Sequence, residues 1–144
     1  MDKMTQKEAR REFREHIIKL LYIREFHEPE EMDEQIENYF TVILENSCPE
    51  DEKTKVIERF KAICEKLPEI DSVIAEISVG WRLNRIGKVE LQCLRNSVYE
   101  MKEDEEIPSK IAINEAVELA KTYGGENSHA FVNGILAKLV TEDE

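Results

Sequence analysis

The strongest constraint on the fold is the spacing of the apolar residues, which recur every three or four positions along nearly the whole chain. This is the period of a helix that buries one face. The stretches with this period run over residues 5–24, 30–44, 51–67, 70–80, 89–101, 108–123 and 128–139. The four prolines, at positions 29, 49, 68 and 108, fall between stretches or at the start of one, where a helix is expected to end or begin. No alternating pattern typical of a strand occurs, so the chain is predicted to be all-α with about seven helices.

The charge of the whole chain argues against a nucleic-acid ligand. Thirty-two acidic residues against 20 basic ones give a net charge of −12, which repels phosphates and anionic membranes. The charge is unevenly distributed, however. Residues 1–24 hold seven basic and four acidic residues, a net of +3, so the remaining 120 residues carry −15.

The first helix is predicted to carry a basic face. At about 100° per residue, five basic side chains fall on one arc about 100° wide, while Glu8, Glu12 and Glu15 fall on another. The five are Lys3, Lys7, Arg10, Arg11 and Arg14. A basic stripe on an acidic protein suits the phosphates of a nucleic acid, and Tyr22, which extends the arc, can stack on an unpaired base. On composition alone, an ordinary solvated helix with i,i+4 charge pairs is the simpler interpretation.

Metal and catalytic motifs are missing from the sequence. Cys48, Cys64 and Cys93 have no C-x-x-C spacing, and His16, His27 and His129 have no metal-binding spacing. No G-x-S-x-G or Walker motif occurs. A dyad of Cys93 and His129 would require the fold to bring them together, and Cys93 lies on a predicted buried stripe. No metal, cofactor or enzymatic activity is therefore expected.

The sequence also predicts where the protein resides. No apolar run approaches the ~20 residues that span a bilayer, and no apolar segment follows Met1-Asp2-Lys3. A cytoplasmic protein without a membrane partner is therefore expected.

The C-terminal half contains a long and specific motif. It comprises IPSKIAINEAVELAKTYG at 107–124 and SHAFVNGIL at 128–136. Upstream lie Trp81-Arg82-Leu83-Asn84-Arg85-Ile86, Leu94-Arg95 and Tyr99-Glu100, and near the N-terminus Ala9-Arg10-Arg11 precedes Leu20-Leu21-Tyr22. In this order and spacing, the residues closely resemble the NusB family of bacterial transcription antitermination factors.

The resemblance implies a fold and a function. The fold would be an N-terminal three-helix bundle, residues 1–66, packed on a C-terminal helical subdomain, residues 67–144. The function would be antitermination on ribosomal RNA operons by a protein that pairs with NusE, a small-subunit ribosomal protein. The pair would bind the single-stranded boxA element of the transcript, with other Nus factors and RNA polymerase as indirect partners.

Matching by position to the family gives the candidate site residues. The candidate RNA-binding residues from this match are Lys7, Arg10, Arg11, Arg14, Tyr22, Asn127, Ser128 and Phe131, and the basic arc adds Lys3. The candidate partner-binding residue is Glu90, at the start of the fifth predicted helix.

The chain departs from the family pattern at two places. Glu8 and Glu12 make the first helix less basic than usual, which predicts weak RNA binding by the chain alone. Asn96-Ser97 replaces an apolar pair, a polar step that would loosen packing or alter a partner surface. The main alternative is a helical protein-interaction module without RNA binding. A further one is a domain of an RNA methyltransferase, whose catalytic domain would have to lie outside this chain.

Overall fold

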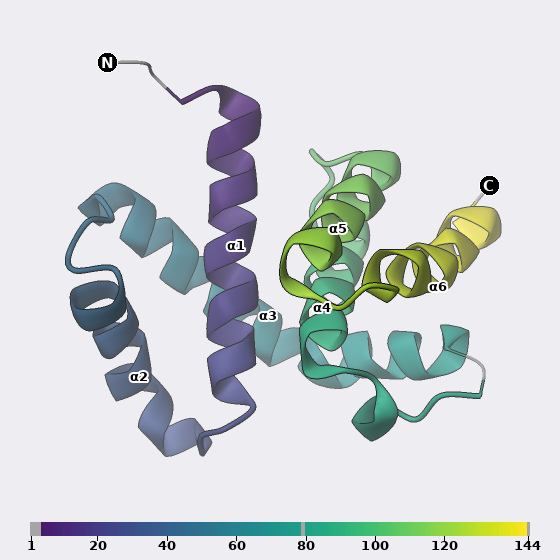
Figure 1. Cartoon of the computed structure of the whole chain (residues 1–144), viewed down its shortest axis with the longest axis horizontal. Helices are drawn as coiled ribbons and strands as arrows, with labels where there is room; N and C mark the ends of the chain where they lie inside the picture. Colours follow the sequence, from purple (N-terminus) through teal and green to yellow (C-terminus); the bar gives the residue numbers. More distant parts are fainter. Residues whose placement is uncertain (1–3, 79, 144) are drawn as a thin grey trace. The chain divides into compact units, whose positions relative to one another are not determined.

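The computed structural model describes residues 4–78 and 80–143, and every regular element in that range is helical. The α-helices are α1 (Gln6–Arg24), α2 (Met32–Asn38), α3 (Glu50–Ile77), α4 (Lys88–Glu103), α5 (Ser109–Tyr123) and α6 (Ser128–Asp143) (Figure 1). Three short helical segments lie among them: η1 (Pro29–Glu31), η2 (Tyr39–Ile43) and η3 (Leu83–Arg85). The all-α prediction is confirmed for these residues.

The predicted break at Pro68 is wrong, so the described residues form six α-helices rather than about seven. Residues 51–67 and 70–77 belong to the single helix α3, which contains Pro68. The buried positions continue at helical spacing through Ile63, Leu67, Ile70 and Ile74. A proline inside a helix costs about 3 kcal/mol, whereas burial of each large aliphatic side chain stabilises by about 1.5–3 kcal/mol. Four such side chains on one continuous face therefore outweigh the proline.

The chain divides into two compact units between Ala62 and Ile63, inside α3 and a few residues before the expected boundary at residue 66. The buried apolar side chains of the first unit come from α1, α2, η2 and the first part of α3. They include Ile17, Leu20, Leu21, Ile36, Tyr39, Phe40, Val56 and Phe60. Helices α1 and α2 are in direct contact.

In the second unit, α4, α5 and α6 pack against one another. Helix α4 is buried from Leu91 to Val98, and this stretch includes the polar pair Asn96-Ser97. Asn96 Nδ2 donates to Glu100 Oε2 at 3.1 Å, and Ser97 Oγ donates to the Ala112 carbonyl at 3.2 Å. The polar step thus forms two hydrogen bonds inside the unit, while the buried Asn96 Oδ1 has no partner among the described residues.

Candidate nucleic-acid interface

The basic residues predicted on α1 differ in exposure. Lys7 and Arg10, on the first two turns, are exposed. Arg11 is half-buried, and Arg14 is buried with only 4% of its surface exposed. Lys3 lies outside the described residues. The exposed positive charge of α1 is therefore concentrated near its N-terminus.

The acidic residues between these cations interact with other groups. Thr5 Oγ1 accepts from the Glu8 backbone N–H at 3.1 Å, which caps the helix, and donates to Glu8 Oε1 at 3.0 Å. Glu12 Oε1 lies 3.7 Å from His16 Nε2. Within the part of the chain that the structure describes, neither Lys7 nor Arg10 forms an ion pair. Both cations are therefore available for a ligand.

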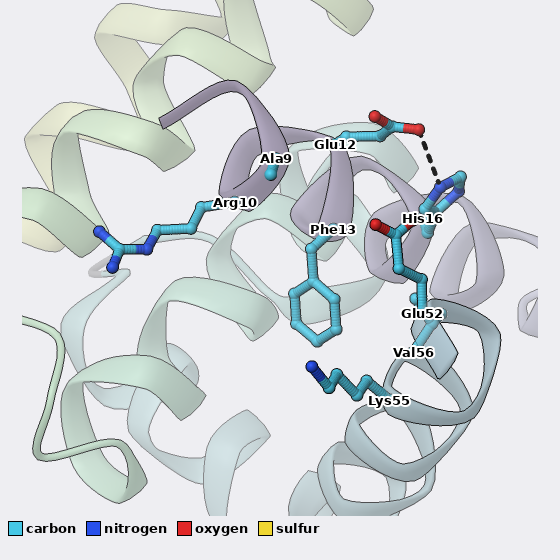
Figure 2. A pocket seen from close by; sticks show the side chains of 8 residues that line it. All are labelled: Ala9, Arg10, Glu12, Phe13, His16, Glu52, Lys55 and Val56. Carbon is cyan, nitrogen blue, oxygen red and sulfur yellow. Dashed lines mark ion pairs between the residues drawn. The ribbon is translucent and has the colours of Figure 1, made fainter. Parts of the chain in front are cut away.

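A cavity of about 200 Å³ lies beside these residues, within the first unit. Figure 2 shows Phe13 and Lys55 pointing toward each other across it, while the Arg10 guanidinium extends away from the other labelled side chains. The volume lies below the ~300 Å³ at which small-molecule sites begin. This face of α1 is thus suited to contacts with phosphates rather than to enclosing a base.

His16, on the rim of this cavity, has a structural environment. Its Nδ1 lies 2.7 Å from Tyr39 Oη, and the two rings meet edge to face. Burial lowers the pKa of His16, an effect that the nearby Glu12 carboxylate opposes in part. The ring is therefore neutral at pH 7 and adds nothing to the positive charge of α1.

Tyr22 lies at the far end of the predicted basic arc. It is 39% exposed and its ring is 5.2 Å from that of Phe26. Twelve residues separate Tyr22 from Arg10, about 18 Å along a helix axis. The arc between them is interrupted, because Arg14 and Ile18 are both buried. Tyr22 and the cations thus form two separate exposed places on α1.

The turn before α6 links two residues that were predicted for different roles. Ser128 is buried; its Oγ donates to Glu90 Oε2 at 2.7 Å and accepts from the Gly125 backbone N–H at 2.8 Å. A Cβ on Gly124 would clash with the Ser128 side chain and would lie 2.7 Å from the Ala120 carbonyl oxygen. A glycine at position 124 is thus needed for this turn. We call residues 124–128 the Ser128 turn.

The other two predicted residues of this region, Asn127 and Phe131, are more exposed than Ser128. Asn127 is exposed at the start of α6. Phe131 is half-buried, and its ring lies 5.5 Å from that of Trp81 at an interplanar angle of 80°. The structure therefore brings Glu90, Ser128 and Phe131 into one region of the second unit, together with Trp81.

Sequence reasoning missed the functional potential of Trp81 and its neighbours. Trp81 is 52% exposed, and Arg82 and Arg85 are exposed as well. A usable signal was present, since residues 80–88 contain three basic residues, no acidic residue and the only tryptophan of the chain.

Among the residues that the structure describes, no group of three or more His, Cys, Asp or Glu side chains could hold a metal ion. Burial raises the pKa of the Cys93 thiol to about 12, so this thiol is protonated at neutral pH and is a poor nucleophile. None of the described helices is long and apolar enough to cross a membrane.

Known proteins resemble the chain over nearly its whole length. Residues 11–141 match the profile of the NusB family. Transcription antitermination protein NusB of Lachnoclostridium phytofermentans is 52% identical over 132 residues, which cover 92% of this chain and 98% of that protein. A solved structure of T. maritima NusB superimposes with a TM-score of 0.77 at 34% identity, covering 92% of this chain and 91% of the other. A chain in the crystal structure of a plectonemic RNA supercoil gives a TM-score of 0.75 at 25% identity, covering 93% and 95% of the two chains.

Proposed function

We propose a function for this chain from its membership of the NusB family, whose members are transcription antitermination factors and not enzymes. In this proposal the chain pairs with NusE, and the pair binds boxA-type single-stranded RNA in ribosomal RNA transcripts. Other Nus factors and RNA polymerase would be reached through that complex. The protein would act in the cytoplasm, where transcripts are made.

One observation carries the RNA-binding part of the proposal: Lys7 and Arg10 are exposed and form no ion pair with other described residues, although the chain as a whole is strongly acidic. Cations that meet phosphates release condensed counterions, and this gives affinity that depends on salt but hardly on sequence. If Lys7, Arg10 and Arg11 each neutralise one phosphate of a single strand, the slope of log K against log[salt] is about −2.

The second unit would supply further RNA contacts around the start of α6. Asn127 is exposed there and can contact RNA directly, while exposed N–H groups at a helix N-terminus favour phosphate. Ser128 is buried by its hydrogen bond to Glu90, so its contribution would be to hold the turn. Glu90 in turn is the proposed contact with NusE.

NusE would raise the affinity by adding surface for the same strand. A few phosphate contacts and one or two stacked bases give only modest affinity, and the −15 on the rest of the chain opposes it. When one protein of the pair is bound to the RNA strand, the other is held close to the same strand at a high effective concentration, which raises the overall affinity. We therefore expect weak RNA binding by this chain alone and much tighter binding by the pair.

Fluorescence anisotropy of a labelled boxA-type RNA tests the proposal, with and without NusE, at 50 and 200 mM salt. With a slope of about −2, the fourfold rise in salt should weaken binding about 16-fold. The variant Lys7→Glu/Arg10→Glu should lose binding. Its matched control, Lys102→Glu/Lys110→Glu, makes the same charge change at two other exposed positions that form no ion pair with described residues, and should retain most of the binding.

The alternative, a helical interaction module without RNA binding, predicts a different outcome. In that case the charge reversal on α1 changes nothing measurable and the fold persists in both variants. Equal RNA affinity with and without NusE would contradict the cooperative part of the proposal.

A further inference from the structure

The segment between α3 and α4 is fixed at both ends. The Ser78 hydroxyl donates to the Trp81 carbonyl at 3.3 Å, and the Trp81 N–H donates to the Ser78 carbonyl at 2.9 Å. From α6, Lys138 Nζ donates to the last carbonyl of α3 at 2.8 Å. At the other end, Ile86 is buried. Residues 80–88, which we call the Trp81 segment, are thus held in place beside α6.

The exposed side chains of the Trp81 segment combine one large aromatic ring with cations. Trp81 remains 52% exposed although Phe131 packs against it at 5.5 Å. Arg82 and Arg85 are exposed, and within the described ranges neither guanidinium forms an ion pair. The segment carries a charge of +3 from these arginines and Lys88, in a chain with a net charge of −12.

We infer that the Trp81 segment is a second RNA-binding site, in which Trp81 stacks on an unpaired base and Arg82 and Arg85 hold the phosphates on either side of it. Stacking on an indole tolerates any base, because every base has a flat π face. The arginines add phosphate contacts and can themselves stack. The inference rests on the proposed function, since it lengthens the path of the same RNA strand.

The position of Trp81 supports RNA as the ligand. Its ring packs on Phe131, in the first turn of α6, and the exposed Asn127 lies directly before that helix. A strand that reaches Asn127 and Phe131 therefore meets Trp81 next, without any rearrangement of the second unit. An acidic protein segment would also be attracted by the arginines, but a single-stranded nucleic acid supplies a flat base and a phosphate at every step along its chain.

Trp81 is the only tryptophan of the chain, so its emission reports on this site alone. The test is a titration of the full chain, in complex with NusE, with single-stranded boxA-type RNA. Emission from NusE is removed by subtracting the same titration of the Trp81→Phe complex. We expect quenching that saturates at the RNA concentration where anisotropy saturates. A duplex of the same sequence should quench much less, because its bases are already stacked.

Two sets of variants separate stacking from charge. Trp81→Ala should weaken RNA binding about tenfold, as for the loss of one stacked base, while Trp81→Phe should stay within about threefold of the original. Arg82→Gln/Arg85→Gln should reduce the salt slope by about 1.4, the value for two phosphates of a single strand. The control Lys102→Gln/Lys121→Gln removes two exposed charges elsewhere in the second unit and should leave the slope unchanged.

The outcomes distinguish a failure of the Trp81 site from a failure of the proposed function. RNA binding without quenching, or with equal affinity for the Trp81→Ala variant, overturns the inference and leaves the proposed function intact. A Trp81→Ala variant that loses NusE binding in the absence of RNA makes the segment a protein contact and also overturns it. If the NusE complex binds no RNA at all, the proposed function itself fails.

Discussion

The Ser128 turn gives the sharpest test of how the second unit holds its candidate site. In the variant Ser128→Ala, Glu90 Oε2 loses a donor at 2.7 Å and the Gly125 N–H loses an acceptor at 2.8 Å. Glu90 lies in the first turn of α4, where the proposed NusE contact is, and Gly125 lies in the loop before α6, beside the proposed RNA contact Asn127. The same change therefore affects stability and the placement of Asn127.

The expected magnitude follows from these two hydrogen bonds. A hydrogen bond to a charged group contributes about 1.5–3 kcal/mol and a neutral one about 1 kcal/mol. Glu90 is half-buried, so water replaces part of the lost contact, and we expect a net loss of about 2 kcal/mol. At about 2–4 °C per kcal/mol for a chain of this size, Tm should fall by about 4–8 °C.

A double-mutant cycle checks that the stabilisation comes from the Ser128–Glu90 pair. Urea unfolding of Ser128→Ala, Glu90→Ala and the double variant is followed by Trp81 emission and by circular dichroism. Because the partners touch, we expect a coupling energy of at least about 1 kcal/mol. Ser72→Ala, an exposed serine of α3, is the control and should have almost no effect. Additive single effects, or a Ser128→Ala variant as stable as the control, would refute the reasoning.

Two further perturbations test the interior of each unit. Arg95 donates to Asp71 from Nε at 2.9 Å and from Nη2 at 3.0 Å. Arg95→Ala should therefore lower the free energy of unfolding by about 3 kcal/mol. This is the lower end of the range for a buried ion pair, because Asp71 is partly exposed. Arg95→Lys should recover only part of this loss in urea unfolding, and an unchanged midpoint for Arg95→Ala would contradict the assignment. Burial lowers the pKa of His16 below its ordinary value of 6.5. As the pH falls, the imidazole is therefore protonated in the unfolded chain before it is protonated in the folded one. The free energy of unfolding should thus decrease as the pH drops below about 6.5. Thermal unfolding of His16→Gln should show a flatter pH dependence between pH 7 and 5, and parallel curves for the two proteins would argue against this role.

The helices could be predicted from the sequence because apolar periodicity reports burial directly. The predicted stretches 5–24 and 108–123 end at the same residues as α1 (Gln6–Arg24) and α5 (Ser109–Tyr123). The error at Pro68 has a different origin. A proline lowers the stability of a helix locally. The apolar face that offsets this cost, from Ile63 to Ile74, extends over about three turns of α3. It is recognised only when residues 51–67 and 70–77 are treated as one helix.

The candidate site was harder to predict, because an angular position on a helix does not determine exposure. Lys7, Arg10 and Arg14 all belong to one predicted arc, yet only the first two are exposed. Which cations are covered depends on tertiary packing, and a single helix pattern carries no information about it. The hydrogen bond between Glu90 and Ser128 was unpredictable for a similar reason, since 38 residues separate the partners.

The net charge of −12 and the proposed RNA binding are compatible because a phosphate responds to nearby charges and not to their sum. At physiological salt the Debye length is about 8 Å, so acidic residues on distant faces are largely screened from a bound strand. The exposed cations of the two proposed RNA contacts are Lys7 with Arg10 in the first unit and Arg82 with Arg85 in the second. Glu8 and Glu12 contact Thr5 and His16 rather than Lys7 or Arg10, so their negative charges reduce the local potential of the first group without occupying its cations. The second group has no acidic residue within residues 80–88. Local composition and side-chain pairing therefore determine where a polyanion can bind, while the acidic remainder disfavours binding elsewhere on the protein.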